Sequence, residues 1–198
     1  MLVFGENYND SQSIGHLLVH LNPRLAGRVR PLPRPTSLTR QAKAKAVRSW
    51  VTELDRTIRG YEAGGRQVTA ALVHRDADDP DPDGAVAIAL SNDLAPLGRA
   101  HPVVPVEEIE AWWFLFPDAV EAVRPSAWRD TIPRRARDVE RIRNPKQELQ
   151  RLTGRRKKAR YEEAESPRVA EFVRQLGLRP QGSSASYHRF GAVARSLT

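Results

Sequence analysis

Three acidic residues, at two places in the chain, have the types and spacing of a cation site. Asp76 and Asp78 follow directly on the apolar residues 68–73, and in extended chain two side chains at this spacing leave on the same side. Glu6 follows the shorter apolar residues 1–4. Close carboxylates repel each other unless a cation lies between them, and a site made of oxygen atoms alone favours Mg²⁺ or Mn²⁺. The alternative is a solvated turn, because the aspartates, prolines and glycine that follow also form turns.

A parallel β-sheet would bring these residues together. A continuous apolar run closed by polar residues is typical of a strand buried on both faces of such a sheet, and open α/β folds bind ligands at the carboxyl edge of the strands. Apolar spacing and turn residues predict strands at 1–4, 25–32, 68–73 and 101–106, and helices from about 11 to 21 and at 39–61, 85–97 and 107–116. Strands and helices alternate, which predicts an α/β fold with a mostly parallel central sheet flanked by helices.

Length and composition predict one globular domain. The 198 residues suit a single unit, with an α/β core at 1–125 and a basic, mainly helical part at 126–198 packed on it. The absence of cysteine excludes disulfides and thiolate metal sites and fits a cytoplasmic protein. We find no apolar run of membrane-spanning length and no secretory signal, so we expect no membrane association.

Positive charge points to a polyanionic partner. The net charge is +8 and the isoelectric point is near 10.4. Residues 129–160 hold thirteen Lys and Arg against four Asp and Glu, including the run Arg155, Arg156, Lys157 and Lys158. Such a block is either a solvated face or a surface that holds phosphates. The aromatic residues at 112–116 are expected in the core, and the pair His16 and His20 lacks a recognisable third zinc ligand.

Several short motifs resemble the TOPRIM (topoisomerase–primase) superfamily. Residues Gly5 to Asp10 after an apolar strand, and Asp76-Ala77-Asp78 after another, are similar to its Glu-Gly turn and its Asp-x-Asp motif. The chain more closely resembles small bacterial TOPRIM-like domains of uncharacterised function related to the OLD-family nucleases. That likeness rests on the segments Ile109-Glu110-Ala111-Trp112, Pro145-Lys146 and Ser184 to Phe190. One departure is Asn7, which stands where the family has glycine.

The resemblance implies a Rossmann-like TOPRIM fold and a Mg²⁺- or Mn²⁺-dependent nuclease acting on DNA or RNA. Its metal would be held by Glu6, Asp76 and Asp78. Glu110 would be a further carboxylate or the general base, and the phosphate-positioning residues would be Lys146, Arg155, Arg156, Lys157 and Lys158. The resemblance also implies a companion ATPase in bacterial anti-phage defence, and an oligomer is possible. The alternatives are a non-catalytic regulatory module that binds a partner protein or nucleic acid, and a small-molecule phosphotransferase.

Overall fold

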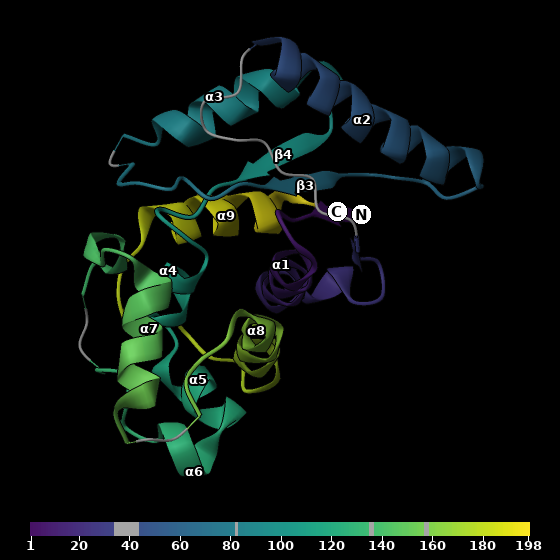
Figure 1. The fold of residues 1–198 in the computed structure, drawn as a ribbon. Coiled ribbons are helices and arrows are strands. Elements are labelled where there is room, and N and C mark those ends of the chain that lie inside the picture. Colours follow the sequence, from purple (N-terminus) through teal and green to yellow (C-terminus); the bar gives the residue numbers. More distant parts are fainter. Residues whose placement is uncertain (34–43, 82, 135–136, 157–158) are drawn as a thin grey trace.

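Four parallel strands form the central sheet of the protein. The computed structural model describes residues 1–33, 44–81, 83–134, 137–156 and 159–198, without the side chains of residues 44 and 156. The strands β1 (Leu2–Phe4), β2 (Arg30–Pro31), β3 (Ala71–His74) and β4 (Ala100–Val103) lie in the order β2-β1-β3-β4 (Figure 1). All three strand pairings are parallel. This α/β arrangement is consistent with a Rossmann-like fold and confirms the expected parallel sheet flanked by helices.

Helices cover both faces of the sheet, and the alternation of strand side chains divides the core between them. On one face, Leu2, Phe4 and Val73 pack with residues of α2 (Ala44–Ala63) and α3 (Ala85–Leu94). On the other face, side chains of the intervening strand positions pack with α1 (Tyr8–Leu21) and α9 (Ala185–Ser196) (Figure 1). Because β3 lies between β1 and β4, all four of its residues are buried, as its apolar sequence predicted.

The remaining helices contribute to the same core as α1. They are α4 (Glu110–Trp113), α5 (Pro117–Val123), α6 (Pro125–Trp128), α7 (Pro145–Thr153) and α8 (Ser166–Gln175), and α8 packs against both α1 and α5. The indole groups of this region are buried, and each finds a hydrogen-bond acceptor. Trp112 Nε1 donates to Ser186 Oγ at 3.0 Å, and Trp113 Nε1 donates to Ser166 Oγ at 2.8 Å. The aromatic run is therefore core, as predicted.

Prolines accompany two shifted element boundaries. The strand expected at 25–32 shrinks to Arg30–Pro31 after a 3₁₀ turn at Pro23–Leu25, since proline cannot donate to a sheet. The helix expected at 85–97 ends at Leu94, and Ala95–Leu97 forms a 3₁₀ turn around Pro96. The first part of the helix expected at 39–61 lies outside the described residues. Within the described part of the chain, no helix is both long and apolar enough to cross a membrane.

Candidate functional site: an acidic cluster at the sheet edge

Glu6 and Asp76 meet at the carboxyl edge of the sheet. Phe4 of β1 is paired with Val73 of β3, so the residues just beyond these two strand ends are neighbours. The Asp76 backbone N–H donates to Glu6 Oε1 at 3.2 Å. Burial raises the pKa of Glu6, and the nearby Asp76 carboxylate raises it further. The structure thus places together two of the three carboxylates that the sequence singled out.

The chain bends at Asp78, and the extended geometry that we expected after Asp76 is wrong. Asp78 has a positive φ of 57° and is exposed, and its N–H donates to the Glu107 carbonyl at 3.0 Å. Because the chain turns here, Asp76 and Asp78 do not follow the alternation of a strand. Asp78 still raises the pKa of Glu6, as the smallest of several influences, so it lies within electrostatic reach of the cluster.

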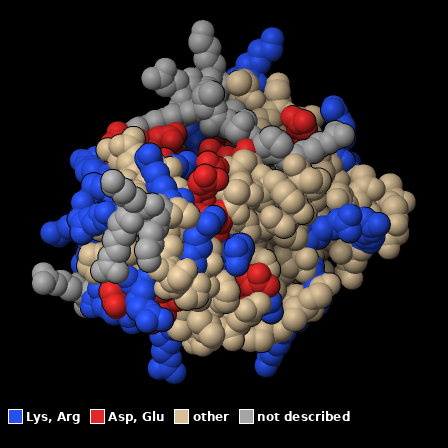
Figure 2. Space-filling view, turned by 60° about the horizontal axis from the view of Figure 1, so that its bottom comes forward, with Lys and Arg blue, Asp and Glu red and all other residues tan. Residues whose placement is uncertain are grey.

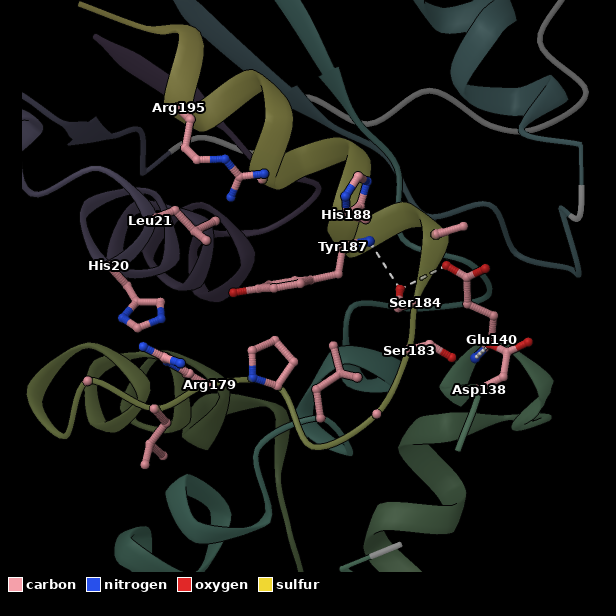
Figure 3. A pocket seen from close by; sticks show the side chains of 17 residues that line it. His20, Leu21, Asp138, Glu140, Arg179, Ser183, Ser184, Tyr187, His188 and Arg195 are labelled. Carbon is pink, nitrogen blue, oxygen red and sulfur yellow. Dashed lines mark hydrogen bonds between the residues drawn. The ribbon is translucent and has the colours of Figure 1, made fainter. Parts of the chain in front are cut away.

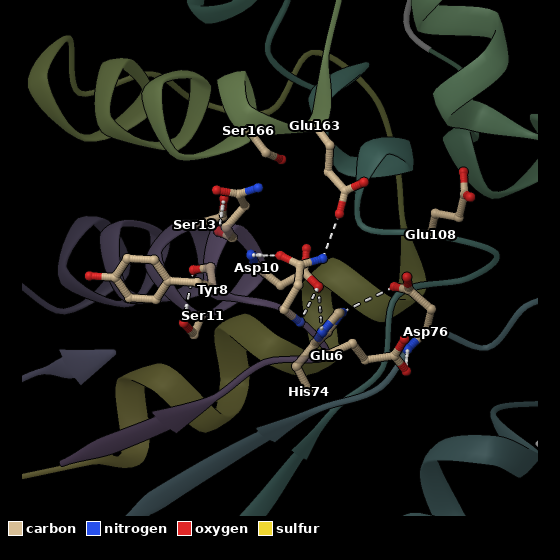
Figure 4. A network of polar contacts seen from close by, with 12 residues as sticks. Glu6, Tyr8, Asp10, Ser11, Ser13, His74, Asp76, Glu108, Glu163 and Ser166 are labelled. Carbon is tan, nitrogen blue, oxygen red and sulfur yellow. Dashed lines mark hydrogen bonds and ion pairs between the residues drawn. The ribbon is translucent and has the colours of Figure 1, made fainter. Parts of the chain in front are cut away.

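His74 lies between two aspartates beneath the sheet edge (Figure 4). Its Nε2 is 3.0 Å from Asp76 Oδ1, and its Nδ1 is 3.6 Å from Asp10 Oδ2. Burial lowers the pKa of His74, but the carboxylates of Asp76, Asp10 and Glu6 outweigh burial and raise it to about 9. His74 is therefore a buried cation at neutral pH. Burial likewise raises the pKa of Asp10 to about 6, against the opposing charge of His74.

The turn between β1 and α1 positions Asp10. Asn7 caps the helix: its Oδ1 accepts from the Asp10 N–H at 3.0 Å, and Asp10 Oδ2 accepts from the Asn7 N–H at 3.3 Å. The φ of Asn7 is −138°, an extended backbone, so this turn needs no glycine at position 7. It does need Gly5, where a Cβ atom would lie 2.5 Å from the Asn7 carbonyl oxygen and 2.6 Å from the Ser11 nitrogen.

A second group of charges faces the first from α4, α7 and the segment before α8. Lys146 Nζ lies 3.4 Å from Glu163 Oε2 and 3.8 Å from Glu108 Oε1. Asn7 Nδ2 donates to Glu163 Oε1 at 2.5 Å and so joins the two groups. Glu110 is 1% exposed and accepts a hydrogen bond from the Tyr161 hydroxyl at 3.2 Å. Burial raises the pKa of Glu110 to about 8, although the Lys146 charge opposes this.

Glu107 and Glu108 stabilise a different helix from the one expected. The helix predicted at 107–116 begins only at Glu110, because Glu107 has a positive φ of 58°. The Glu107 carboxylate accepts from the Asn144 N–H, and the Glu108 carboxylate accepts from the Lys146 N–H, both at 3.1 Å. The acidic pair thus satisfies free N–H groups at the start of α7, where negative charge also suits the helix dipole.

The predicted phosphate-positioning residues are only partly described. Lys146 lies between the carboxylates of Glu108 and Glu163. Arg155 is exposed in the 3₁₀ turn Gly154–Arg156. Lys157, Lys158 and the side chain of Arg156 lie outside the described part of the structure. On the face drawn in Figure 2, Asp and Glu side chains gather near the middle, and Lys and Arg side chains border them.

Around Asp76, the carboxyl groups described above outnumber the two cations His74 and Lys146. Asp76 raises the pKa of four other carboxyl groups. We use the name acidic cluster for Glu6, Asp10, Asp76, Glu108, Glu110 and Glu163, together with the two cations His74 and Lys146. Among the residues that the structure describes, no three His, Asp or Glu side chains are arranged so that they could hold one metal ion together. The oxygen-only donors fit a hard cation in their chemistry, with Glu6 and Asp76 as the adjacent pair.

Sequence reasoning missed part of this cluster. Asp10 was named only as the end of the Gly5 to Asp10 motif and not as a site residue, and Glu163 was not considered. The spacing Asn7-x-x-Asp10 is a capping-box signal that could have placed the Asp10 carboxylate beside the end of β1. Glu163 reaches the site from 156 residues beyond Asn7, and no local pattern indicates such a contact.

Comparisons with known proteins do not add to this geometry. The chain matches no family model, no curated protein and no solved structure. The residues and their arrangement therefore carry the functional argument.

Proposed function

We propose that the protein is a TOPRIM-type nuclease that depends on Mg²⁺ or Mn²⁺ and acts on DNA or RNA. The observation that carries the proposal is the excess of carboxylates around Asp76 at the carboxyl edge of a parallel sheet. Like charges gathered in a partly buried site destabilise the folded protein unless a cation offsets them. Cation sites of this kind occur where open α/β sheets bind their ligands.

Glu6 and Asp76 are the residues that would hold the ion, with Asp78 at its outer side. Mg²⁺ commonly takes only one or two protein carboxylates and completes its shell with water and substrate phosphate oxygens, so an adjacent pair is sufficient. A bound divalent ion would supply charge neutralisation for the phosphate and activation of a water molecule.

The neighbouring side chains would keep this pair in place. His74 donates to Asp76 Oδ1 and thereby fixes the orientation of that carboxylate. Asp10 lies 3.6 Å from the other imidazole nitrogen, as an opposite charge, and is itself positioned by the helix cap. Glu110, at 1% exposure, would act as a further carboxyl group at the floor of the site. Its raised pKa would also allow it to accept a proton near neutral pH.

Basic side chains beside the acidic cluster support a nucleic acid as the substrate. Arg143, whose side chain is 66% exposed and pairs with Glu107, lies just before α7, and Lys146 lies in the first turn of that helix. Arg155, which is exposed, would also contact the phosphate backbone, and so would the other cations of the Arg155–Lys158 run, whose side chains lie outside the described part of the structure. A companion ATPase and a role in anti-phage defence remain part of the proposal through the family resemblance alone.

The test is a cleavage assay on supercoiled plasmid, linear DNA and structured RNA with Mg²⁺, Mn²⁺ or EDTA. We expect the wild type to cleave only with metal and Asp76→Asn to lose at least about a hundredfold in rate. Asp55→Asn is the matched control, because Asp55 pairs with Arg59 on α2, outside the acidic cluster. Binding of Mn²⁺, followed by the relaxation of water protons, gives a second readout that does not require turnover.

A non-catalytic module is the second candidate, and one observation favours it. His74 and Lys146 already place two cations among the carboxylates, so the cluster could be a structural network. This candidate predicts no Mn²⁺ binding at millimolar concentration together with retained nucleic-acid binding. Metal-dependent cleavage that is undiminished in Asp76→Asn would contradict the assigned site.

A further inference from the structure

A separate cavity of about 810 Å³ lies at the opposite end of α1 from the acidic cluster. Its wall includes His20 and Leu21 at the end of α1, the turn before α9, and residues of α9 itself (Figure 3). Small-molecule sites in proteins typically have volumes of about 300–1,000 Å³, so this cavity has the size of a ligand site. None of the residues of the acidic cluster lines it.

The cavity contains a buried hydroxyl group that lacks a partner. Tyr187 is 6% exposed, and its ring packs edge-on against Trp112 and Phe116 at centroid distances of 5.3 and 5.5 Å. Its hydroxyl oxygen is buried without a hydrogen-bond partner among the described residues. Figure 3 shows this hydroxyl pointing toward His20 and Arg179. Because an unpaired buried hydroxyl is costly, a ligand that accepts its hydrogen bond would recover that cost.

Two arginine side chains line the same cavity as Tyr187. Arg179 and Arg195 are exposed, and neither forms an ion pair within the described parts of the chain. The Arg195 guanidinium folds back over Gly191, where a Cβ atom would lie 3.1 Å from its Nη1. The Arg195 charge also lowers the pKa of the Tyr187 hydroxyl, although burial raises it more strongly. Two arginines and a phenolic donor together suit a phosphate group.

The other end of the cavity offers hydrogen-bond acceptors. Asp138 and Glu140 line it beside Ser183 and Ser184. Glu140 Oε1 accepts from Ser184 Oγ at 2.8 Å and from the Ser186 N–H at 2.6 Å, which fixes this carboxylate in place. Apolar side chains also line the cavity, namely Leu21, Leu115, Leu178 and Pro180.

We propose that this cavity binds a nucleoside monophosphate. The phosphate would lie against Arg179 and Arg195 and accept from the Tyr187 hydroxyl. The base would lie along the apolar wall, and amino or ribose hydroxyl groups would donate to Asp138 and Glu140. Such a ligand carries a phosphate for the two arginines, a flat base for the apolar side chains and hydrogen-bond donors for the two carboxylates that line the cavity. The proposal does not rest on the proposed nuclease activity, because the two sites share no residue.

Calorimetric titration of the full chain with AMP and with GMP tests the proposal. We expect at least one of them to bind with a dissociation constant below about 1 mM, a free energy of about −4 kcal/mol. Arg179→Gln and Arg195→Gln should each weaken binding about tenfold, since each removes one charged hydrogen-bond donor. Arg168→Gln, at an exposed position of α8 that does not line the cavity, should leave binding unchanged.

Tyr187→Phe provides the sharpest test because it should weaken nucleotide binding without lowering the stability of the free protein. Without ligand, its melting temperature should equal or exceed that of the wild type, because the lost hydroxyl is unpaired. Nucleotide binding should weaken about tenfold. The proposal is overturned if neither nucleotide binds below about 1 mM, if adenosine or inorganic phosphate alone binds as tightly as the nucleotide, or if the arginine variants bind like the wild type. Asp76→Asn should retain nucleotide binding, which separates this site from the nuclease site.

Discussion

Replacement of Glu110 by glutamine should remove a pH dependence from the stability of the protein. In the folded state burial raises the pKa of Glu110 from 4.5 to about 8. Between these values the folded protein keeps a proton that the unfolded chain releases. The free energy of unfolding therefore falls as the pH rises, by about 1.4 kcal/mol per pH unit for this group, and the loss is complete once the pH passes the folded pKa.

The size of the effect follows from the pH interval. From about pH 5.5 to about pH 8, Glu110 should cost the wild type about 3 kcal/mol. Glutamine has nearly the same shape, cannot ionise, and can accept the Tyr161 hydrogen bond through its amide oxygen. We therefore expect the stability advantage of Glu110→Gln over the wild type to grow by about 3 kcal/mol between pH 5.5 and pH 8.5.

Urea denaturation near pH 5.5, 7 and 8.5, without divalent metal, measures this difference. Glu148→Gln is the matched control. Arg151 lowers the pKa of Glu148 through a hydrogen bond, so Glu148 stays ionised throughout the range, and its replacement should shift stability by the same amount at each pH. A difference between Glu110→Gln and the wild type that does not change with pH would refute the assignment of a buried, proton-binding carboxyl group.

Two further substitutions test the turn that positions Asp10. Gly5→Ala should lower the free energy of unfolding by about 2 kcal/mol or more in urea denaturation, because the new Cβ atom would overlap backbone atoms of Asn7 and Ser11. The control is Gly60→Ala in α2, where a Cβ atom meets nothing within 4 Å, and this substitution should instead stabilise the protein by up to about 1 kcal/mol. Asn7→Ala removes the cap of α1 and should lower the free energy of unfolding by about 1 kcal/mol, and an unchanged urea midpoint would show that the capping box contributes nothing.

The strands and helices with the strongest periodicity were predictable, and their ends were less so. The apolar run before His74 identified the central strand, and the spacing of Ile14, Leu17, Leu18 and Leu21 identified α1. One misplaced boundary, the start of the helix expected at 107–116, depends on a backbone conformation that is set by distant contacts. Glu107 adopts a positive φ where its carboxylate binds the start of α7, and no neighbouring residue in the sequence indicates this.

For the site, sequence reasoning brought Glu6 and Asp76 to the same edge of the sheet because strand ends in a parallel sheet are geometrically linked. It did not identify His74 as the bridge between two aspartates, because a buried histidine in a strand most often packs without such partners. The contribution of Glu163 depends on how α8 packs on α1, and such packing is set by the three-dimensional core rather than by local spacing.

The position of α9 has a consequence for synthesis of the chain on the ribosome. β4 ends at Val103, but α9, which covers Val3, Leu72 and Val103 of the sheet together with α1, begins only at Ala185. At a translation rate of about 5–20 residues per second, the intervening residues 104–184 delay this helix by on the order of 5–15 s. During that interval the nascent chain presents an incompletely covered apolar sheet face. Chaperones that bind exposed apolar segments would therefore bind the emerging sheet. This face of the sheet is fully covered only after α9 has left the ribosome.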